Sequence, residues 1–237
     1  MIRIFTLLLL FSLSPILSAN INPNTFFVEG DLNPLNINNN ELITTRIINN
    51  WDGSAAIPSP QILEMAVSGY LNLLKGKKIQ MGTPLSIIDF SLPSSKERLW
   101  IIDPHNGELL HHSLVSHGRN SGELMAKKFS NINSSFMSSI GFYVTGETYQ
   151  GKHGYSLRLD GVEKGFNDNA RRRAIVIHGA EYANRDFVVA TGRLGRSLGC
   201  PALPMANHKE IINIIKNGSC LFIYGKDQTY IQKSSLI

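Results

Sequence analysis

Apolar residues recur with helical spacing in two parts of the chain. Between Gln61 and Lys75 they stand three and four positions apart, which predicts an amphipathic helix that ends at Gly76. In Met205–Lys216 isoleucines share one face and Gly218 follows as a stop, so a second helix is predicted there.

Elsewhere the apolar runs are short, and several of them alternate with polar residues, which predicts strands. Pro104-His105-Asn106-Gly107 is a turn sequence, and it predicts a hairpin between the runs on either side. Many short strands and few helices indicate a mainly β fold of the α+β type. The predicted strands are Leu85–Phe90, Arg98–Asp103, Leu109–Ser116, Ile140–Thr145, Tyr155–Leu159, Arg173–His178 and Ser219–Tyr224.

The segment before the first predicted helix has no clear period. Residues 20–58 are rich in asparagine and proline, and we expect an extended arm or linker there. The rest divides into a helical segment 59–79, a main domain 80–228 and a C-terminal tail 229–237.

The chain opens with a basic residue, Arg3, an apolar stretch Ile4–Leu17 and the small residues Ser18 and Ala19. This order is typical of a secretory signal peptide, and the apolar stretch is shorter than the roughly 20 residues of a spanning helix. We therefore expect residues 1–19 to be a signal peptide and the protein to be exported to the periplasm or cell wall. After removal of residues 1–19 we expect no integral membrane segment.

The net charge of the chain indicates which kinds of partner the protein binds. Loss of residues 1–19 removes Arg3 and no acidic residue, which lowers the formal net charge from +5 to +4. A mildly basic protein suits an anionic surface such as a cell wall. No run of Lys and Arg with interleaved aromatic residues is present, so we expect no nucleic-acid binding. The sequence does not determine an oligomeric state.

The candidate chemistry lies in the loop Ser197-Leu198-Gly199-Cys200-Pro201. A thiol is a useful nucleophile as the thiolate, and a nearby imidazole is the usual means of forming it. The small residue Gly199 keeps the sulfur accessible and leaves backbone N–H groups free for an oxyanion. The predicted helix from Met205 would also bring its positive end near the sulfur. We predict that Cys200 is the nucleophile of an acyl transfer through a thioester.

His178 ends an apolar run, and Gly179 follows it. A buried core histidine is the alternative interpretation. Because the end of a strand lies at the rim of a sheet and glycine permits close approach, we predict that His178 is the general base and then the general acid. Its second ring nitrogen needs an acceptor, and a backbone carbonyl would suffice.

Cys220 lies in an apolar run that predicts a buried strand. In an oxidising compartment a Cys200–Cys220 disulfide is the competing possibility. We favour Cys220 as a core residue and Cys200 as a free thiol.

Several further residues are weaker candidates. His153 and Tyr149 are expected to line the cleft, where Tyr149 would pack against a peptide. Ser197 would either bond within the cysteine loop or contribute to the oxyanion pocket. The run Arg171-Arg172-Arg173 is expected to be a solvated face. His111 and His112 would point to opposite faces of a strand, and we expect no metal site and no cofactor.

The motifs together resemble a known family. His178-Gly179 followed by Ser197-x-Gly199-Cys200 is similar to the signature of the L,D-transpeptidase catalytic (YkuD-type) domain, in the form of its second branch. Val115-Ser116-x-Gly118 and the segment Gly141–Gly146 match the family upstream. The resemblance covers about residues 80–225.

This resemblance implies a fold and a reaction. The family fold is a β-sandwich with a few peripheral helices, one of them short and beside the cysteine loop. The family acts on peptidoglycan stem peptides: the cysteine attacks the L-centre carbonyl of diaminopimelate, expels D-Ala and passes the acyl group to an amine, which gives a 3-3 cross-link. With water as acceptor the enzyme would be an L,D-carboxypeptidase. The family uses no cofactor or metal.

One position departs from the family pattern. Most members have an arginine two residues after the cysteine, and this chain has Ala202. An arginine suits a carboxylate because it binds it through two parallel hydrogen bonds. We expect Arg196, or Arg193 as second choice, to supply that charge.

Two other functions compete. A papain-like protease uses the same dyad, but its cysteine precedes its histidine, the reverse of the order here. A non-catalytic wall-binding module would carry the Cys200–Cys220 disulfide. The state of the two thiols separates this module from an enzyme.

Overall fold

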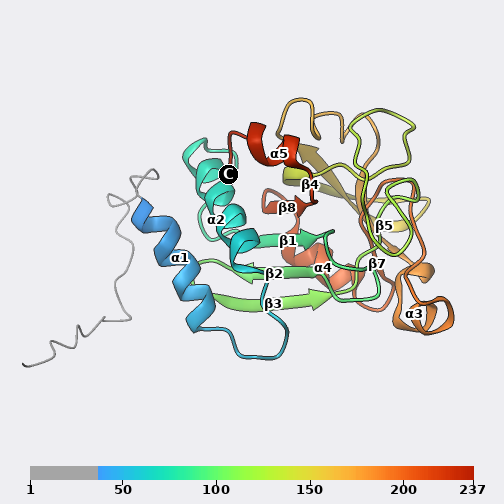
Figure 1. Ribbon diagram of the computed structural model, residues 1–237, viewed down its shortest axis with the longest axis horizontal. Coiled ribbons are helices and arrows are strands. Elements are labelled where there is room, and N and C mark those ends of the chain that lie inside the picture. The colour runs from blue at the N-terminus through green and yellow to red at the C-terminus, as the bar shows by residue number, and fades with distance from the viewer. Residues whose placement is uncertain (1–36) are drawn as a thin grey trace, which may run out of the picture. The chain divides into compact units, whose positions relative to one another are not determined.

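The computed structural model describes residues 37–237 (Figure 1). The predicted signal peptide and the first part of the predicted arm lie outside these residues. Within the described part, no helix is long and apolar enough to cross a membrane.

Eight strands form one mixed sheet in the order β3-β2-β1-β8-β4-β5-β6-β7. The pairs β1–β8 and β6–β7 are parallel, and the other pairs are antiparallel. The predicted hairpin is confirmed, since β2 and β3 pair across Pro104–Gly107. The strands are β1 Leu85–Asp89, β2 Leu99–Asp103, β3 Glu108–Ser113, β4 Gly141–Gly151, β5 Gly154–Gly161, β6 Val176–Ala180, β7 Ala202–Pro204 and β8 Cys220–Tyr224.

Short helices surround the sheet, and the predicted mainly β, α+β fold is confirmed. Helix α2 packs on β1 and β8 at the centre of the sheet, whereas α4 packs near β5 and β6 (Figure 1). The helices are α1 Ile37–Asn49, α2 Pro60–Lys75, α3 Arg185–Thr191, α4 His208–Ile215 and α5 Gln228–Lys233, with a 3-10 turn at Glu181–Ala183.

The prediction of an extended arm over residues 20–58 is wrong for helix α1. Ile43 and Ile47, four positions apart, are buried in the core cluster beside α2. Arg46 donates a hydrogen bond to the carbonyl of His105 in the β2–β3 turn, 2.7 Å away. Asparagine-rich sequence has low helix propensity, so this helix depends on tertiary packing.

The predicted tail is also part of the packed domain. Tyr230 of α5 is fully buried and donates its hydroxyl to Glu163, at 3.0 Å. Ser234 donates to the other oxygen of the same carboxylate, at 2.5 Å. Because Glu163 also accepts from the N–H of Phe142, this buried carboxylate fastens α5 to strand β4.

Three boundaries near the cysteine differ from the sequence prediction. The strand expected over Arg173–His178 runs from Val176 to Ala180, because Ala174 has a left-handed φ of 54°. His178 therefore lies in the middle of the strand and is buried, and the expectation that it ends the strand is wrong. Residues 202–204 form strand β7. The helix expected from Met205 begins at His208, since the chain first leaves the sheet.

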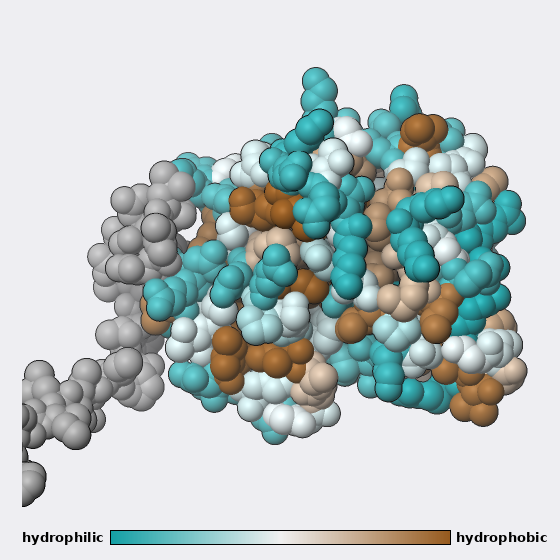
Figure 2. Space-filling view, viewed as in Figure 1, coloured by the Kyte–Doolittle hydropathy of each residue, from teal (hydrophilic) through white to brown (hydrophobic). Residues whose placement is uncertain are grey.

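Hydrophobic residues on the surface are dispersed. On the face shown in Figure 2 they form separate patches among hydrophilic residues. Leu42 and Ile48 of α1 are about half exposed, although the same helix buries Ile43 and Ile47. An amphipathic helix with one face on the core leaves such residues outside.

The core between α2 and the sheet leaves no room at Gly69. A Cβ atom there would overlap the ring of Phe142, which is fully buried and stacks on Phe222 with centroids 4.3 Å apart. Glycine at this position lets the helix approach the sheet closely.

We predict that Gly69→Ala destabilises the protein by about 1–3 kcal/mol, because overpacking outweighs the roughly 1 kcal/mol gain in helix propensity. Chemical denaturation followed by circular dichroism measures this change. Ser68→Ala, one position away and half-buried, is the matched control and should be neutral or slightly stabilising. A more stable Gly69→Ala variant would contradict this account.

Candidate active site

The loop that carries Cys200 is closed by the side chain of Ser197. The buried Ser197 hydroxyl donates to the carbonyl of Cys200 at 2.6 Å and accepts from the N–H of Gly199 at 3.0 Å. Of the two roles predicted for Ser197, its contacts favour hydrogen bonding within the loop.

Gly199 fits this loop for two reasons. Its φ of 125° is unfavourable for a residue with a side chain. A Cβ atom would also lie 2.8 Å from the carbonyl oxygen of Met137. The Ser138 hydroxyl donates to the carbonyl of Gly199 at 3.2 Å, so the loop is docked on residues 137–138.

The sulfur of Cys200 lies beside the start of β6. Its thiol donates to the carbonyl of Ala174 across 3.7 Å, and Cys200 is partly exposed and free. Burial of the sulfur raises the pKa of Cys200, whereas the N–H of Val176 and the charges of Arg173 and Lys152 lower it. Because burial dominates, the resting group is the thiol, and a base is required to form the thiolate.

The sheet register brings His178 to the same face as this loop. His178 pairs with Ser156 of β5 and with Ala202 of β7. Continuing the β6–β7 register by two residues puts Cys200 opposite Val176, which agrees with the contact of the Val176 N–H. Residues two apart on a strand share a face, so the side chains of Val176 and His178 point the same way.

Alternation sends the neighbouring residues to the core. Leu157 of β5 and its partner Ile177 of β6 belong to the hydrophobic core cluster. Leu203 of β7, which pairs with Gly179 two residues after Ile177, belongs to it as well. Their burial fixes which face of β6 presents His178.

The ring of His178 has a defined tautomer. Nδ1 donates to the carbonyl oxygen of Gly179 at 2.9 Å, because a carbonyl oxygen can only accept. This is the backbone acceptor expected from the sequence. Burial lowers the pKa of His178, and the charges of His153, His208 and Lys152 lower it further. The neutral ring therefore leaves a lone pair on Nε2, as a general base requires.

Two other histidines surround His178 and Gly179. The exposed His153 stacks on the His178 ring, with centroids 4.3 Å apart and an interplanar angle of 19°. The buried His208 packs against Gly179, where a Cβ atom would lie 2.7 Å from the His208 ring. The close approach predicted for Gly179 is thus present. His208 was not a candidate in the sequence, because its neighbours predicted only an amphipathic helix.

Tyr149 of β4 lies in the same register row as His178 of β6, with Ser156 of β5 between them. It pairs with Ser156, and the guanidinium of Arg158 covers its ring at 4.4 Å. The structure therefore brings Cys200, His178, His153 and Tyr149 to one side of the sheet.

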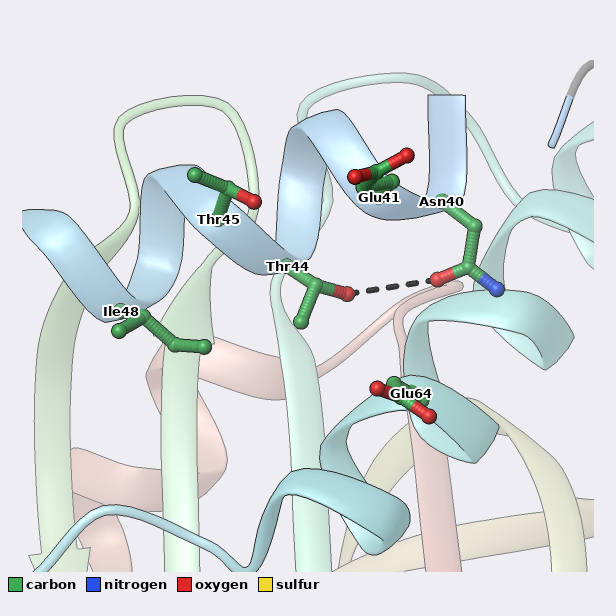
Figure 3. Close-up of a pocket in the computed structure, with 6 residues that line it drawn as sticks. All are labelled: Asn40, Glu41, Thr44, Thr45, Ile48 and Glu64. Atoms are coloured by element: carbon green, nitrogen blue, oxygen red, sulfur yellow. Dashed lines mark hydrogen bonds between the residues drawn. The ribbon is translucent and has the colours of Figure 1, made fainter. Parts of the chain in front are cut away.

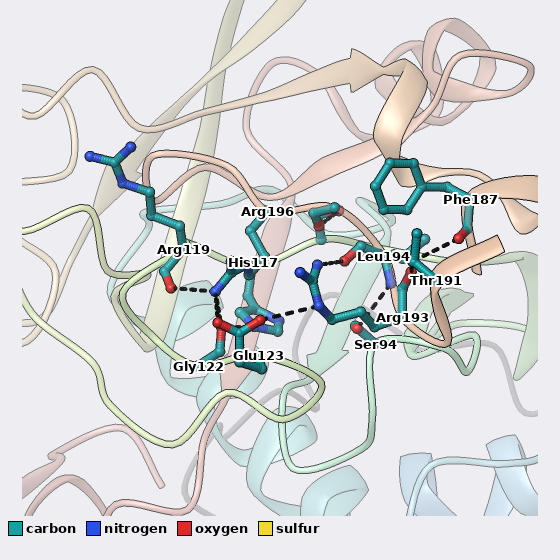
Figure 4. A network of polar contacts seen from close by, with 12 residues as sticks. Ser94, His117, Arg119, Gly122, Glu123, Phe187, Thr191, Arg193, Leu194 and Arg196 are labelled. Carbon is teal, nitrogen blue, oxygen red and sulfur yellow. Dashed lines mark hydrogen bonds and ion pairs between the residues drawn. The ribbon is translucent and has the colours of Figure 1, made fainter. Parts of the chain in front are cut away.

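Arg196 and Arg193 belong to a different network (Figure 4). Both form ion pairs with Glu123, at 2.5 Å and 3.2 Å. Arg196 also donates to the carbonyls of Arg119 and Gly122, each at 3.1 Å. Neither presents a free positive charge, so the carboxylate-binding role predicted for them conflicts with their contacts.

Arg173 is the arginine beside the sulfur, and the prediction that it lies on a solvated face is wrong. Nη1 donates to the Ser130 carbonyl at 2.7 Å and to the Ser139 hydroxyl at 3.1 Å. Nη2 donates to the Ser135 hydroxyl at 3.2 Å and to the Met137 carbonyl at 2.7 Å. Arg173 thus anchors the segment on which the Cys200 loop rests. Its position just before the strand of His178 was the only indication in the sequence.

Cys220 is a core residue, as predicted. It lies in β8, is fully buried and is a free cysteine, as is Cys200. The alternative with a Cys200–Cys220 disulfide is contradicted.

The remaining histidines and the surface pocket lie elsewhere. Nε2 of His111 lies 3.2 Å from the amide of Asn207, whereas His112 stacks on Trp100. No group of metal-ligating side chains occurs among residues 37–237. A pocket of about 330 Å³ lies along α1 and α2 (Figure 3). Its lining includes the carboxylates of Glu41 and Glu64 and no predicted site residue.

Comparisons with known proteins give a family and several distant structures. Residues 55–224 match the L,D-transpeptidase catalytic domain family. An L,D-transpeptidase from Mycobacterium smegmatis is 14% identical with a TM-score of 0.37, over 60% of this chain and 58% of that chain. The cell shape determining protein Pgp2 from Campylobacter jejuni is 14% identical with a TM-score of 0.41, over 73% and 58%. This chain therefore spans less than two thirds of either protein.

A third solved structure is covered more completely. The L,D-transpeptidase (Yku) from Stackebrandtia nassauensis is 10% identical with a TM-score of 0.38, over 80% of this chain and 92% of that chain. No curated protein matches the chain.

We predict that Gly199→Ala destabilises the protein by about 2–4 kcal/mol and slows alkylation of Cys200, because a side chain adds strain and collides with Met137. Gly192→Ala is the control, since its φ of 77° is also left-handed but the space around it is open. The control substitution should lower the free energy of unfolding by about 1–2 kcal/mol and leave the rate of Cys200 alkylation unchanged. Equal alkylation rates in the two variants would refute the docking of this loop.

We predict that Arg173→Gln moves the pH profile of Cys200 alkylation by iodoacetamide to higher pH, because the lost positive charge raises the pKa of Cys200. Arg173→Lys should shift the profile less, since it keeps the charge. The exposed neighbour Arg172 provides the control Arg172→Gln, which should match the wild type. A profile unchanged in Arg173→Gln would exclude this electrostatic role.

Proposed function

The chain belongs to the L,D-transpeptidase catalytic domain family, and from this membership we propose that it is a peptidoglycan L,D-transpeptidase that acts through a cysteine thioester. One observation carries the proposal. The free thiol of Cys200 lies at the start of the strand that presents His178, whose Nδ1–H is held by a carbonyl.

The first half-reaction forms the acyl-enzyme. His178 Nε2 takes the proton of Cys200, and the thiolate attacks the L-centre carbonyl of diaminopimelate in a tetrapeptide. The backbone N–H of Cys200 has no partner within residues 37–237, so it is available for the oxyanion. The C–N bond to D-Ala then breaks, and the imidazolium returns its proton to the departing amine.

The second half-reaction transfers the acyl group. An amine of a second stem peptide attacks the thioester, His178 accepts its proton, and Cys200 leaves. Attack by the side-chain amine of another diaminopimelate gives a 3-3 cross-link. Attack by water gives a tripeptide, which is the L,D-carboxypeptidase alternative. The free cysteines weigh against the disulfide-bridged wall-binding module.

We also propose that the catalytic unit is larger than residues 80–228. The family match begins at residue 55, so it includes α2, whose Gly69 touches the Phe142 ring of β4. The C-terminal helix α5 belongs to the same unit through Glu163. The predicted leader at residues 1–19 supports export to the periplasm or cell wall, where peptidoglycan lies.

We predict that Cys200→Ala abolishes acyl-enzyme formation and that His178→Gln slows it by about 100-fold or more, the usual size of a general-base contribution. Mass spectrometry of the protein incubated with imipenem measures acylation. Cys220→Ala is the matched control, because its thiol is buried in the core. Acylation surviving in Cys200→Ala, or normal rates in His178→Gln, would remove the assigned role.

Product analysis separates the two reactions. The protein is incubated with a disaccharide tetrapeptide, and the products are identified by mass. Dimers joined through two diaminopimelates are expected from transfer. Tripeptide without dimers would establish the carboxypeptidase instead.

A further inference from the structure

The β4–β5 hairpin ends beside the candidate active site. Gly151 of β4 pairs with Gly154 of β5, so Lys152 and His153 form the tip. The left-handed φ of 73° at Gly154 permits the tight turn, as glycine commonly does in short hairpins. The Tyr149 ring lies against Gly151, where a Cβ atom would come within 2.6 Å of it.

The tip is held over the general base. The His153 ring stacks on that of His178 at 4.3 Å, and Ser156 of the same hairpin pairs with His178. Lys152 is therefore the immediate chain neighbour of a residue that covers the catalytic imidazole. Its charge lowers the pKa of Cys200, of His153 and of His178, which means that the ammonium group acts on all three.

Lys152 differs from the arginines of this region because no carboxylate and no hydrogen-bond acceptor among residues 37–237 pairs with its ammonium group. Arg158 pairs with Glu147 at 2.9 Å, and Arg196 and Arg193 pair with Glu123. Arg173 has no carboxylate partner either, but its η nitrogens already donate to four oxygens of residues 130–139. Lys152 is exposed, so its ammonium is open to a ligand.

We propose that Lys152, at the tip of the β4–β5 hairpin, binds the C-terminal carboxylate of the acyl-donor peptide. It thereby supplies the positive charge that Ala202 does not supply beside the cysteine. A peptide that loses its terminal residue to Cys200 brings that carboxylate close to the site, and an ammonium is a compact partner for it. This inference rests on the proposed function and adds to it the residue that recognises the terminal carboxylate of the donor.

The test compares two donor peptides in wild type, Lys152→Gln and Lys152→Arg. One is a disaccharide tetrapeptide ending in a free carboxylate, and the other ends in a carboxamide. We expect Lys152→Gln to lower kcat/KM for the carboxylate peptide about 10-fold, mainly through KM, since a charge-assisted hydrogen bond is lost. In the same variant kcat/KM for the carboxamide peptide should change less than about twofold. Lys152→Arg should retain most of the activity with the carboxylate peptide.

The carboxamide peptide also controls for the thiol, because a change in Cys200 ionisation would slow both peptides equally. Lys78→Gln, an exposed lysine after α2, should behave as wild type with both. If Lys152→Gln keeps the preference for the carboxylate, or if wild type has none, the inference is wrong while the proposed function stands.

If wild type turns over neither peptide, the proposed function fails and the assignment of a donor carboxylate fails with it. Anion binding by Lys152 is then tested without turnover. Cys200 is then alkylated with iodoacetate, which is anionic, and with iodoacetamide, which is neutral. If the ratio of the iodoacetate rate to the iodoacetamide rate is lower in Lys152→Gln than in wild type, an anion-binding lysine at the site is supported. An unchanged ratio overturns it.

Discussion

The register of strand β6 between β5 and β7 is the constraint on which the candidate site depends. Ile177 and its partner Leu157 are buried in the core, and alternation then sends His178 to the opposite face. The parallel pairing of β6 with β7 brings the residues that follow Cys200 alongside His178. A slip of one residue would turn the imidazole into the core and separate it from the sulfur. The hydrophobic effect thus fixes the face of β6 on which the candidate base His178 lies.

Burial and the nearby positive charges have opposite effects on the pKa of Cys200. Burial raises the pKa of Cys200, whereas Arg173, Lys152 and the N–H of Val176 lower it. Burial also lowers the pKa of His178, so at neutral pH Cys200 is a thiol and His178 is a neutral imidazole. The two cations differ in kind: Arg173 is fixed by four hydrogen bonds, and Lys152 remains exposed. The fixed charge supports the resting site, and the exposed one is available to a ligand.

The cysteine loop is held by hydrogen bonds of Ser197 within the loop and to a neighbouring segment. Ser197 bonds to both the carbonyl of Cys200 and the N–H of Gly199, and its own N–H donates to the carbonyl of His117. His117 in turn contacts the buried guanidinium of Arg98 at 2.8 Å. Burial and the charge of Arg98 lower the pKa of His117 to about 4, so it stays neutral in this chain of contacts.

The sequence by itself determined the elements with a clear period and singled out the candidate reactive groups. The 2-residue and 3.6-residue patterns are local, so α2, β1, β2 and β8 were predicted close to their bounds, and Cys200 and His178 stood out by their flanking residues. Tertiary structure alone decided which charges meet the sulfur. Arg196 and Arg193 pair with Glu123, at least seventy positions away in the chain, whereas the charges of Arg173 and Lys152 act on Cys200. Tertiary structure also decided helix α1. Its own sequence has a low helix propensity, and its burial against α2 outweighs that propensity.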